Sequence, residues 1–149
     1  MGKGFIMAID SHMHINSTVL EKVKISDYIN EIINNHDIKS VINVGLNIDT
    51  SNESILISKI NSKFYSTIGI HPLYIESQNV ESLYELGTCD RVVAIGEIGL
   101  DSTKNNFDEQ KSYLIKQIII ANELHLPVVI HANTVSYTHL RAHETGAYL

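Results

Sequence analysis

Short runs of β-branched and other apolar residues alternate along this chain with segments of helical periodicity. The runs, which Gly, Asn or Pro residues bound, predict strands at residues 5–10, 40–45, 64–70, 91–96 and 126–131. Between them, Ile and Leu at helical spacing predict helices at residues 26–36, 50–61, 80–87 and 108–124. Strict alternation of this kind predicts parallel strands joined by right-handed crossovers. We therefore expect an α/β fold whose functional groups gather at the carboxyl ends of the strands.

Two α/β architectures fit this alternation. An open parallel α/β sheet suits the length of 149 residues. A closed TIM (β/α)8 barrel typically takes about 250 residues, so a barrel here would be truncated to about five strands alternating with four helices. The length favours the open sheet, whereas the motifs described below favour the truncated barrel.

Composition and charge narrow the function classes. The chain is 44% hydrophobic and 19% charged, as in one ordinary globular domain. Its apolar runs are far shorter than the ~20 residues of a membrane span, and the first ten residues lack the apolar core of a signal peptide. We therefore expect a cytoplasmic protein with no membrane association. The net charge of -6 argues against a binder that holds nucleic acid through a basic stripe. A nuclease stays possible, because bound metal ions supply positive charge where a phosphate sits.

The first predicted strand ends in Asp10-Ser11-His12-Met13-His14. Alternate residues of an extended chain face the same way, so His12 and His14 can present both imidazoles to one point. Imidazole is a common ligand of Zn²⁺-like ions, and Asp10 is placed to order the pair from a second coordination shell. The plainer interpretation is a solvated pair of loop histidines, which the position after an apolar strand disfavours.

Two later strands also end in polar residues of the kind that bind metals. Glu97 follows four residues of buried type and stands between Gly96 and Gly99. It is either a solvated loop glutamate or a carboxylate that bridges two metal ions. Asp101 follows as a second-shell candidate or a cap of the next loop. His131 ends the fifth apolar run, so the carboxyl edge of a parallel sheet would collect His, Glu and His.

The third predicted strand ends in Gly69-Ile70-His71-Pro72. His71 faces the same edge if the strands are parallel. It would either bind a substrate phosphate or pack beneath the turn at Pro72.

Taken in order and spacing, these motifs resemble those of the TatD-type DNase family, a branch of the amidohydrolase-like TIM barrels. The resemblance runs from about Ile6 to about Asn133 and rests on Asp10-Ser11-His12-Met13-His14, Gly69-Ile70-His71-Pro72, Ala94-Ile95-Gly96-Glu97-Ile98-Gly99-Leu100-Asp101, the helix of Gln110 and Leu126-Pro127-Val128-Val129-Ile130-His131.

The resemblance implies a metal-dependent phosphodiesterase that acts on DNA. By position, His12 and His14 would hold one divalent ion, Glu97 would bridge and be catalytic, and His131 would bind the second ion. The two ions would be Mg, Mn or Zn.

The chain departs from the family pattern at three places. Asn16 stands where an acidic residue is usual, and Ala132-Asn133 replaces a common Ser-Arg pair, which puts the grip on phosphate in doubt. Another ligand histidine and a late aspartate have no match beyond His131. His139 and His143 are poor replacements, because residues 135–149 look like the translation of a sequencing-library adapter.

These departures divide the chain into residues 1–134, a partial hydrolase domain, and residues 135–149, a non-native tail that packs poorly. We expect this chain to cleave DNA weakly or not at all and to self-associate through its open edges. The alternatives are another amidohydrolase-like metal hydrolase and an inert metal-binding fragment.

Overall fold

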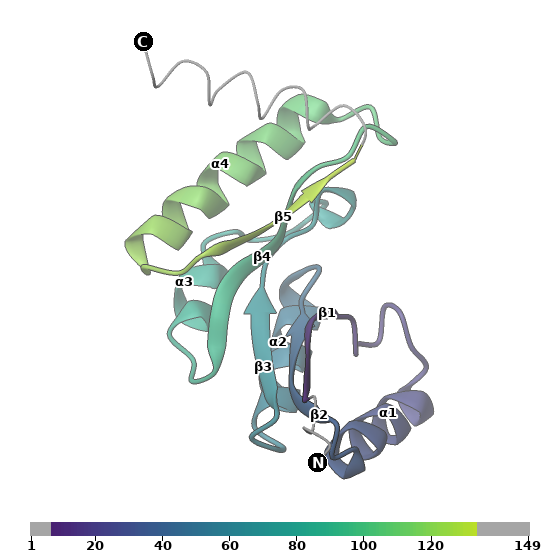
Figure 1. Cartoon of the computed structure of the whole chain (residues 1–149). Coiled ribbons are helices and arrows are strands. Elements are labelled where there is room, and N and C mark those ends of the chain that lie inside the picture. The colour runs from purple at the N-terminus through teal and green to yellow at the C-terminus, as the bar shows by residue number, and fades with distance from the viewer. Residues whose placement is uncertain (1–6, 134–149) are drawn as a thin grey trace, which may run out of the picture.

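The computed structural model describes residues 7–133 of the chain, in which strands and helices alternate (Figure 1). The elements in chain order are β1 (Ala8–Met13), α1 (Lys22–Asn34), β2 (Ile38–Val44), α2 (Ile48–Ser58), β3 (Phe64–Ile68), the 3₁₀ helix η1 (Pro72–Tyr74), α3 (Ser82–Gly87), β4 (Val92–Leu100), α4 (Phe107–Glu123) and β5 (Val128–Ala132). The predicted tail at residues 135–149 lies outside the described residues.

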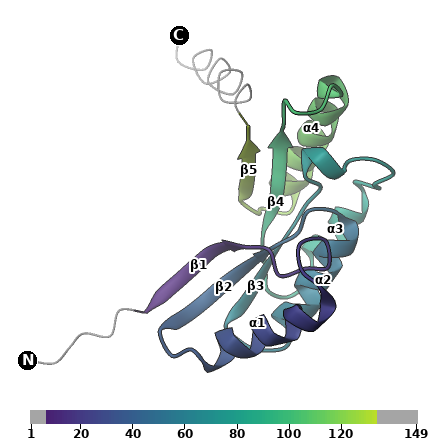
Figure 2. The ribbon, with the colours of Figure 1, turned by 90° about the vertical axis from the view of Figure 1, so that its right-hand side faces the viewer.

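The five strands form one parallel sheet in the order β1-β2-β3-β4-β5, so each strand pairs with its neighbour in the sequence. All four α-helices lie on the same side of this curled sheet (Figure 2). A doubly wound sheet carries helices on both faces and reverses its strand order at a switch point, and this sheet does neither. The arrangement is that of five successive strands of a (β/α)8 barrel.

The core lies between the helices and the outer face of the sheet. Phe64, Ile68 and Ile95 on the strands are fully buried, and α1 and α4 cover them with side chains such as Ile32 and Leu114. Helices α1 and α4 bury apolar residues at helical spacing, as the sequence predicted. Helix α2 instead turns mainly Ser and Thr toward the core, and the predicted stripe residue Ile60 lies beyond its end and is exposed. Within residues 7–133, no helix has both the length and the apolarity to cross a membrane.

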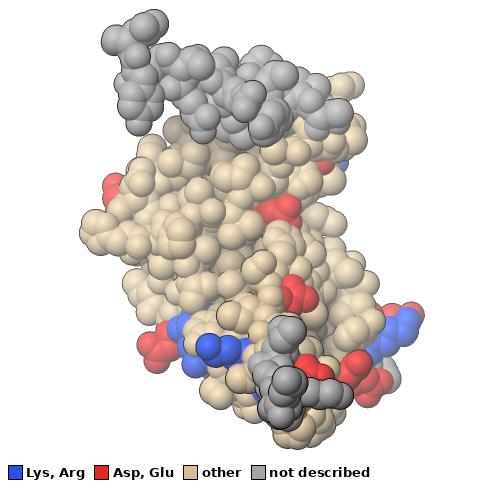
Figure 3. Space-filling view, in the orientation of Figure 1, with Lys and Arg blue, Asp and Glu red and all other residues tan. Residues whose placement is uncertain are grey.

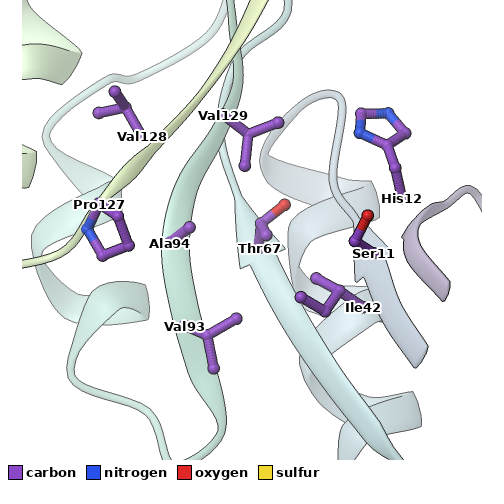
Figure 4. A pocket seen from close by; sticks show the side chains of 9 residues that line it. All are labelled: Ser11, His12, Ile42, Thr67, Val93, Ala94, Pro127, Val128 and Val129. Carbon is purple, nitrogen blue, oxygen red and sulfur yellow. The ribbon is translucent and has the colours of Figure 1, made fainter. Parts of the chain in front are cut away.

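The inner face of the sheet is open and lined by all five strands. Figure 4 shows a pocket on this face whose walls are largely apolar; its residues are Ser11, His12, Ile42, Thr67, Val93, Ala94, Pro127, Val128 and Val129.

On the described surface in Figure 3, Lys and Arg gather toward the lower end and most of the middle is uncharged. Among residues 7–133, the inner face therefore offers no basic stripe for a nucleic-acid backbone.

Two strand boundaries differ from the sequence prediction in a way that matters for the site. The first strand was predicted at residues 5–10, but β1 spans Ala8–Met13, and the fourth was predicted at 91–96, but β4 spans Val92–Leu100. Parallel pairing continues to Asn43 on β2 and to Ala132 on β5. Backbone hydrogen bonds hold polar residues in a strand as firmly as apolar ones, so His12 and Glu97 lie within strands rather than after them.

Candidate metal centre

Glu97 lies in the middle of the candidate centre, on β4, where this strand runs unusually close to β5. At Gly96 a Cβ atom would come within 2.5 Å of the Val129 Cβ, and at Gly99 it would come within 1.9 Å of the His131 carbonyl oxygen. Only residues without a side chain fit there. The two glycines therefore let β5 carry His131 up to the Glu97 carboxylate, the close approach that the sequence predicted.

His12 and His14 approach Glu97 from β1. Their Nε2 atoms are 3.1 Å apart and lie 3.2 and 3.5 Å, respectively, from Glu97 Oε2. The Nδ1 atom of His14 is 3.0 Å from the carbonyl oxygen of Val44, to which an Nδ1–H group donates. In the neutral ring that bond places the hydrogen on Nδ1, so Nε2 offers a lone pair toward the cluster, as in a metal-ligating histidine.

His131 approaches Glu97 from the opposite side. Its Nδ1 atom is 2.9 Å from Glu97 Oε1, and its Nε2 atom is 2.9 Å from Asp101 Oδ2. Asp101 is only 3% exposed, and its Oδ1 accepts hydrogen bonds from the backbone N–H and the hydroxyl of Thr103. The ring of His131 is thus held between two carboxylates, of which Asp101 is itself fixed by the following loop.

His71 completes this side of the cluster. It is buried, and its ring lies against that of His131, with 4.2 Å between the ring centroids. Its Nδ1 accepts a hydrogen bond of 3.2 Å from the backbone N–H of Leu73 and so caps η1. An Nδ1 that accepts carries no hydrogen, so the neutral ring bears its hydrogen on Nε2.

Burial and neighbouring charges separate the protonation states within the cluster. Burial, together with the nearby His131, lowers the pKa of His71 to about 4. The hydrogen bond with Glu97 raises the pKa of His14 above its ordinary value, although burial opposes this. Burial also acts to raise the pKa of Glu97, but the hydrogen bonds with His14 and His131 outweigh it and bring that pKa to about 2. The carboxylate is therefore ionised at neutral pH and able to attract cations.

Two groups of potential ligand atoms share Glu97. In each group the atoms lie within 4.8 Å of one another; the groups are His12, His14 and Glu97, and His71, Glu97 and His131. The structure thus brings together the four residues that the sequence picked out as metal ligands and adds His71 beside them. Asp10 lies at the rim, where its Oδ1 accepts from the backbone N–H of His12 and not from an imidazole.

Some residues that shape the centre were not predicted from the sequence. The side-chain amide of Asn133 lies 3.3 Å from Asp101 Oδ2, so the position where the family pattern has Arg supports the carboxylate that holds His131. Asn16 is buried, and its Oδ1 accepts from the backbone of Thr18, which orders the loop after the histidine pair. Neither contact has a local sequence signal, because both depend on loops that only the fold brings together.

Comparison with known proteins places this centre in a family. The sequence pattern described as TatD related DNase matches residues 9–145. The chain belongs to the TatD related DNase family. The resemblance seen in the motifs is confirmed, and with it the assignment of the chain to a family of metal-dependent hydrolases.

Individual TatD relatives support the same assignment. The chain is 32% identical over 134 residues to the "Uncharacterized metal-dependent hydrolase YabD" of Bacillus subtilis, covering 84% of this chain and 50% of that protein. It is 34% identical over 92 residues to the "3'-5' ssDNA/RNA exonuclease TatD" of Escherichia coli, covering 58% of this chain and 35% of that protein. The chain spans about half the length, or less, of these curated relatives.

A solved structure confirms the TatD fold. The crystal structure of YjjV, a TatD homologue from Escherichia coli, matches with a TM-score of 0.76 at 22% sequence identity, covering 91% of this chain and 56% of that chain. The truncated barrel is therefore the correct architecture, and the open doubly wound sheet that the length favoured is wrong.

Proposed function

We propose that this chain comes from a divalent-metal-dependent hydrolase that cleaves phosphodiester bonds in DNA. The observation that carries the proposal is the position of Glu97 between two separate sets of imidazoles. Oε2 faces His12 and His14, and Oε1 faces His131. A carboxylate that offers one oxygen to each of two nitrogen groups has the form of a bridge between two metal ions.

The residues present fit two divalent ions. His12 and His14 would hold one ion, His131 would hold the other, and Glu97 would bridge them. Imidazole nitrogens favour Zn²⁺ over Mg²⁺, whereas the carboxylate accepts Zn²⁺, Mn²⁺ or Mg²⁺. When bound, such ions supply positive charge for a phosphate and lower the pKa of water. Because the described inner face carries no basic stripe, this charge would be the main attraction for a DNA backbone.

His71 is better suited to bind substrate than to bind metal. Its Nδ1 accepts the backbone N–H of Leu73, which leaves Nε2 as a donor rather than a ligand. The lowered pKa keeps the ring neutral at pH 7. We infer that Nε2–H donates to a non-bridging phosphate oxygen of the substrate. Asp101 would act from behind by orienting His131, and Asp10 would order the backbone of His12.

The first test is a metal titration. We expect the chain, after EDTA treatment and dialysis, to bind two equivalents of Mn²⁺ or Zn²⁺ in isothermal titration calorimetry. The double variant His12→Ala, Glu97→Ala should lose both binding events. A matched double variant at exposed positions, Glu31→Ala on α1 with His36→Ala just beyond its end, should bind like the original chain. If the original chain binds no divalent ion, the proposal is wrong.

Cleavage of a single-stranded oligonucleotide tests the substrate class. We expect slow, EDTA-sensitive cleavage by this chain, because histidine and aspartate ligands of the family pattern have no match in it. Cleavage that persists in the His12→Ala, Glu97→Ala variant would come from a contaminating nuclease. Fast cleavage that this variant abolishes would confirm the phosphodiesterase and refute the expectation of weak activity.

A further inference from the structure

Three buried carboxamide side chains make the same two-bond contact with the backbone. Each accepts a hydrogen bond from the N–H and donates one to the C=O of a single residue. The three carboxamides are those of Asn43, Gln110 and Gln117, and each is at most 1% exposed. We call this contact a carboxamide clamp. A carboxamide can make it because it carries a donor and an acceptor side by side, like a peptide group.

The clamp of Gln117 fixes the residue before His71. Gln117 on α4 accepts from the N–H of Ile70 at 2.7 Å and donates to its C=O at 3.0 Å. Ile70 lies two residues beyond the end of β3 and is 1% exposed. Its peptide groups therefore lack both a strand partner and water, and Gln117 supplies both bonds from a distant part of the sequence.

The clamp of Gln110 fixes Asp101 itself. Gln110, two turns before Gln117 on α4, accepts from the N–H of Asp101 at 2.8 Å and donates to its C=O at 3.0 Å. Asp101 is the first residue after β4. With both backbone groups held, its carboxylate is directed toward His131.

The clamp of Asn43 fixes the residue after His14. Asn43 on β2 accepts from the N–H of Ile15 at 2.7 Å and donates to its C=O at 3.1 Å. Ile15 is 1% exposed and lies two residues beyond the end of β1. All three clamps thus act one or two residues past a strand end, where sheet pairing stops and the candidate centre begins.

We propose that Asn43, Gln110 and Gln117 are positioning residues of the candidate metal centre. They extend sheet-like hydrogen bonding beyond the strand ends and so fix the peptide units from which the side chains of His14, His71 and Asp101 project. The importance of this geometry for catalysis rests on the proposed function. The claim that the clamps fix the backbone is independent of the proposed function, because the clamps form without a bound metal.

The test uses Gln117, because its side chain touches none of the proposed ligands. Gln117→Met keeps the size of the side chain and removes both bonds to Ile70. Leu114→Val is the matched control, because Leu114 is buried on the same face of α4 between the two glutamines and contacts no strand end in a clamp. Both variants should unfold at lower denaturant concentration than the original chain, so stability alone does not separate a clamp from ordinary packing.

The decisive measurement is the ring ¹H–¹⁵N spectrum of His71 in the full chain with EDTA, assigned by its loss in a His71→Asn variant. We expect the His71 signals to shift or broaden in Gln117→Met and to stay in place in Leu114→Val. If Gln117→Met does not fold, Gln117→Glu, which retains the acceptor for the Ile70 N–H, should show the same shift to a smaller extent. His71 signals that match the original chain in every folded Gln117 variant, or that move equally in Leu114→Val, would overturn the proposal.

A metal titration then links the clamp to the proposed function. Gln110→Met should bind Mn²⁺ or Zn²⁺ about tenfold more weakly than Leu114→Val, because Gln110 fixes Asp101 and Asp101 holds the proposed ligand His131; effects of this size are seen for outer-shell partners. Absence of metal binding by the original chain would refute the proposed function, whereas the metal-free spectrum of His71 would still decide the positioning role. Equal affinities for Gln110→Met and Leu114→Val, together with a shifted His71 spectrum in Gln117→Met, would show that the clamps fix the backbone without serving metal binding, and would overturn that part of the proposal.

Discussion

The candidate centre has two halves that meet at Glu97 and are held very differently. The first half, His12 and His14 from β1, lies at an edge of the sheet, where the His12 side chain is 40% exposed. The second half, His71 and His131, is more enclosed, with the His131 side chain 24% exposed and bonded at both ring nitrogens. The difference teaches that similar strand-end histidines become unequal once their neighbours are considered.

His14 in the first half and His71 in the second favour opposite protonation states when no metal is bound. In the first half, the contact with Glu97 raises the pKa of His14, which stabilises the protonated ring. In the second half, burial lowers the pKa of His71 to about 4 and stabilises the neutral ring. Metal binding to the first half should therefore displace a proton, as binding to protonated ligands requires. His71, which the proposed function assigns to the substrate, stays neutral and takes no part in this release of a proton.

The largest expected effect comes from the residue that joins the halves. Glu97→Gln removes the charge that both sides share, so we expect metal affinity to fall by more than about 100-fold at both halves, beyond the effect usual for outer-shell changes. Competition with a chromophoric chelator measures this. Glu31→Gln, on the exposed part of α1, controls for net charge. If only one of two binding events weakens, Glu97 is not a bridge and the halves act independently.

The sequence predicted which residues meet at the candidate centre more accurately than it predicted how they are held. Alternation of strands and helices with polar residues at strand ends was enough to bring His12, Glu97 and His131 to one edge. The carboxamide clamps were missed, because a glutamine within a helical stripe looks like a surface residue until the fold shows it facing a strand end. Gln110 illustrates this: it belonged to the family resemblance, yet no physical role could be assigned to it from the sequence.

Chain length alone favoured the wrong architecture, the open sheet, whereas the motifs predicted the truncated barrel, which is confirmed. Length measures how much core a chain can build, whereas the side of the sheet on which each helix packs depends on the crossovers. Sequential strand order with all helices on one face identifies a barrel segment whatever its length.

The next largest effect is the pH dependence of folding stability, to which His71 and His14 contribute in different pH ranges. The pKa of His71 is about 6.5 in the unfolded chain and about 4 in the folded chain. As pH drops from 6.5 to 4, His71 therefore becomes protonated in the unfolded chain but stays neutral in the folded chain, and the free energy of unfolding should fall. The loss is on the order of 3 kcal/mol, since one pKa unit corresponds to about 1.4 kcal/mol. The raised pKa of His14 acts above this window, where its stabilisation is lost as pH rises.

Urea denaturation of the EDTA-treated chain at several pH values measures this profile. His71→Asn keeps an acceptor for the N–H of Leu73 but cannot titrate, so it should flatten the profile between pH 6.5 and 4. Glu97 contributes mainly below that window, because its pKa is lowered from about 4.5 to about 2 and its stabilisation is lost as pH falls between these values. An unchanged slope in His71→Asn would mean that the enclosed half does not hold its histidine neutral.

The smallest effect on metal affinity should come from Asp10, the carboxylate beside the exposed half. Comparing Asp10 with Asp101, the carboxylate of the enclosed half, sharpens the contrast between the halves. Asp101→Asn removes the negative charge beside the His131 ring, so we expect about 10- to 100-fold weaker metal binding in the second half. Asp10→Asn should change affinity in the first half by less than about threefold. Among the described residues, the Asp10 carboxylate accepts a hydrogen bond from the backbone N–H of His12, and an amide oxygen can accept the same bond. Chelator competition on both variants decides the matter. Equal losses would mean that Asp10 orders the imidazoles after all, and that the two halves share one design despite their unequal burial.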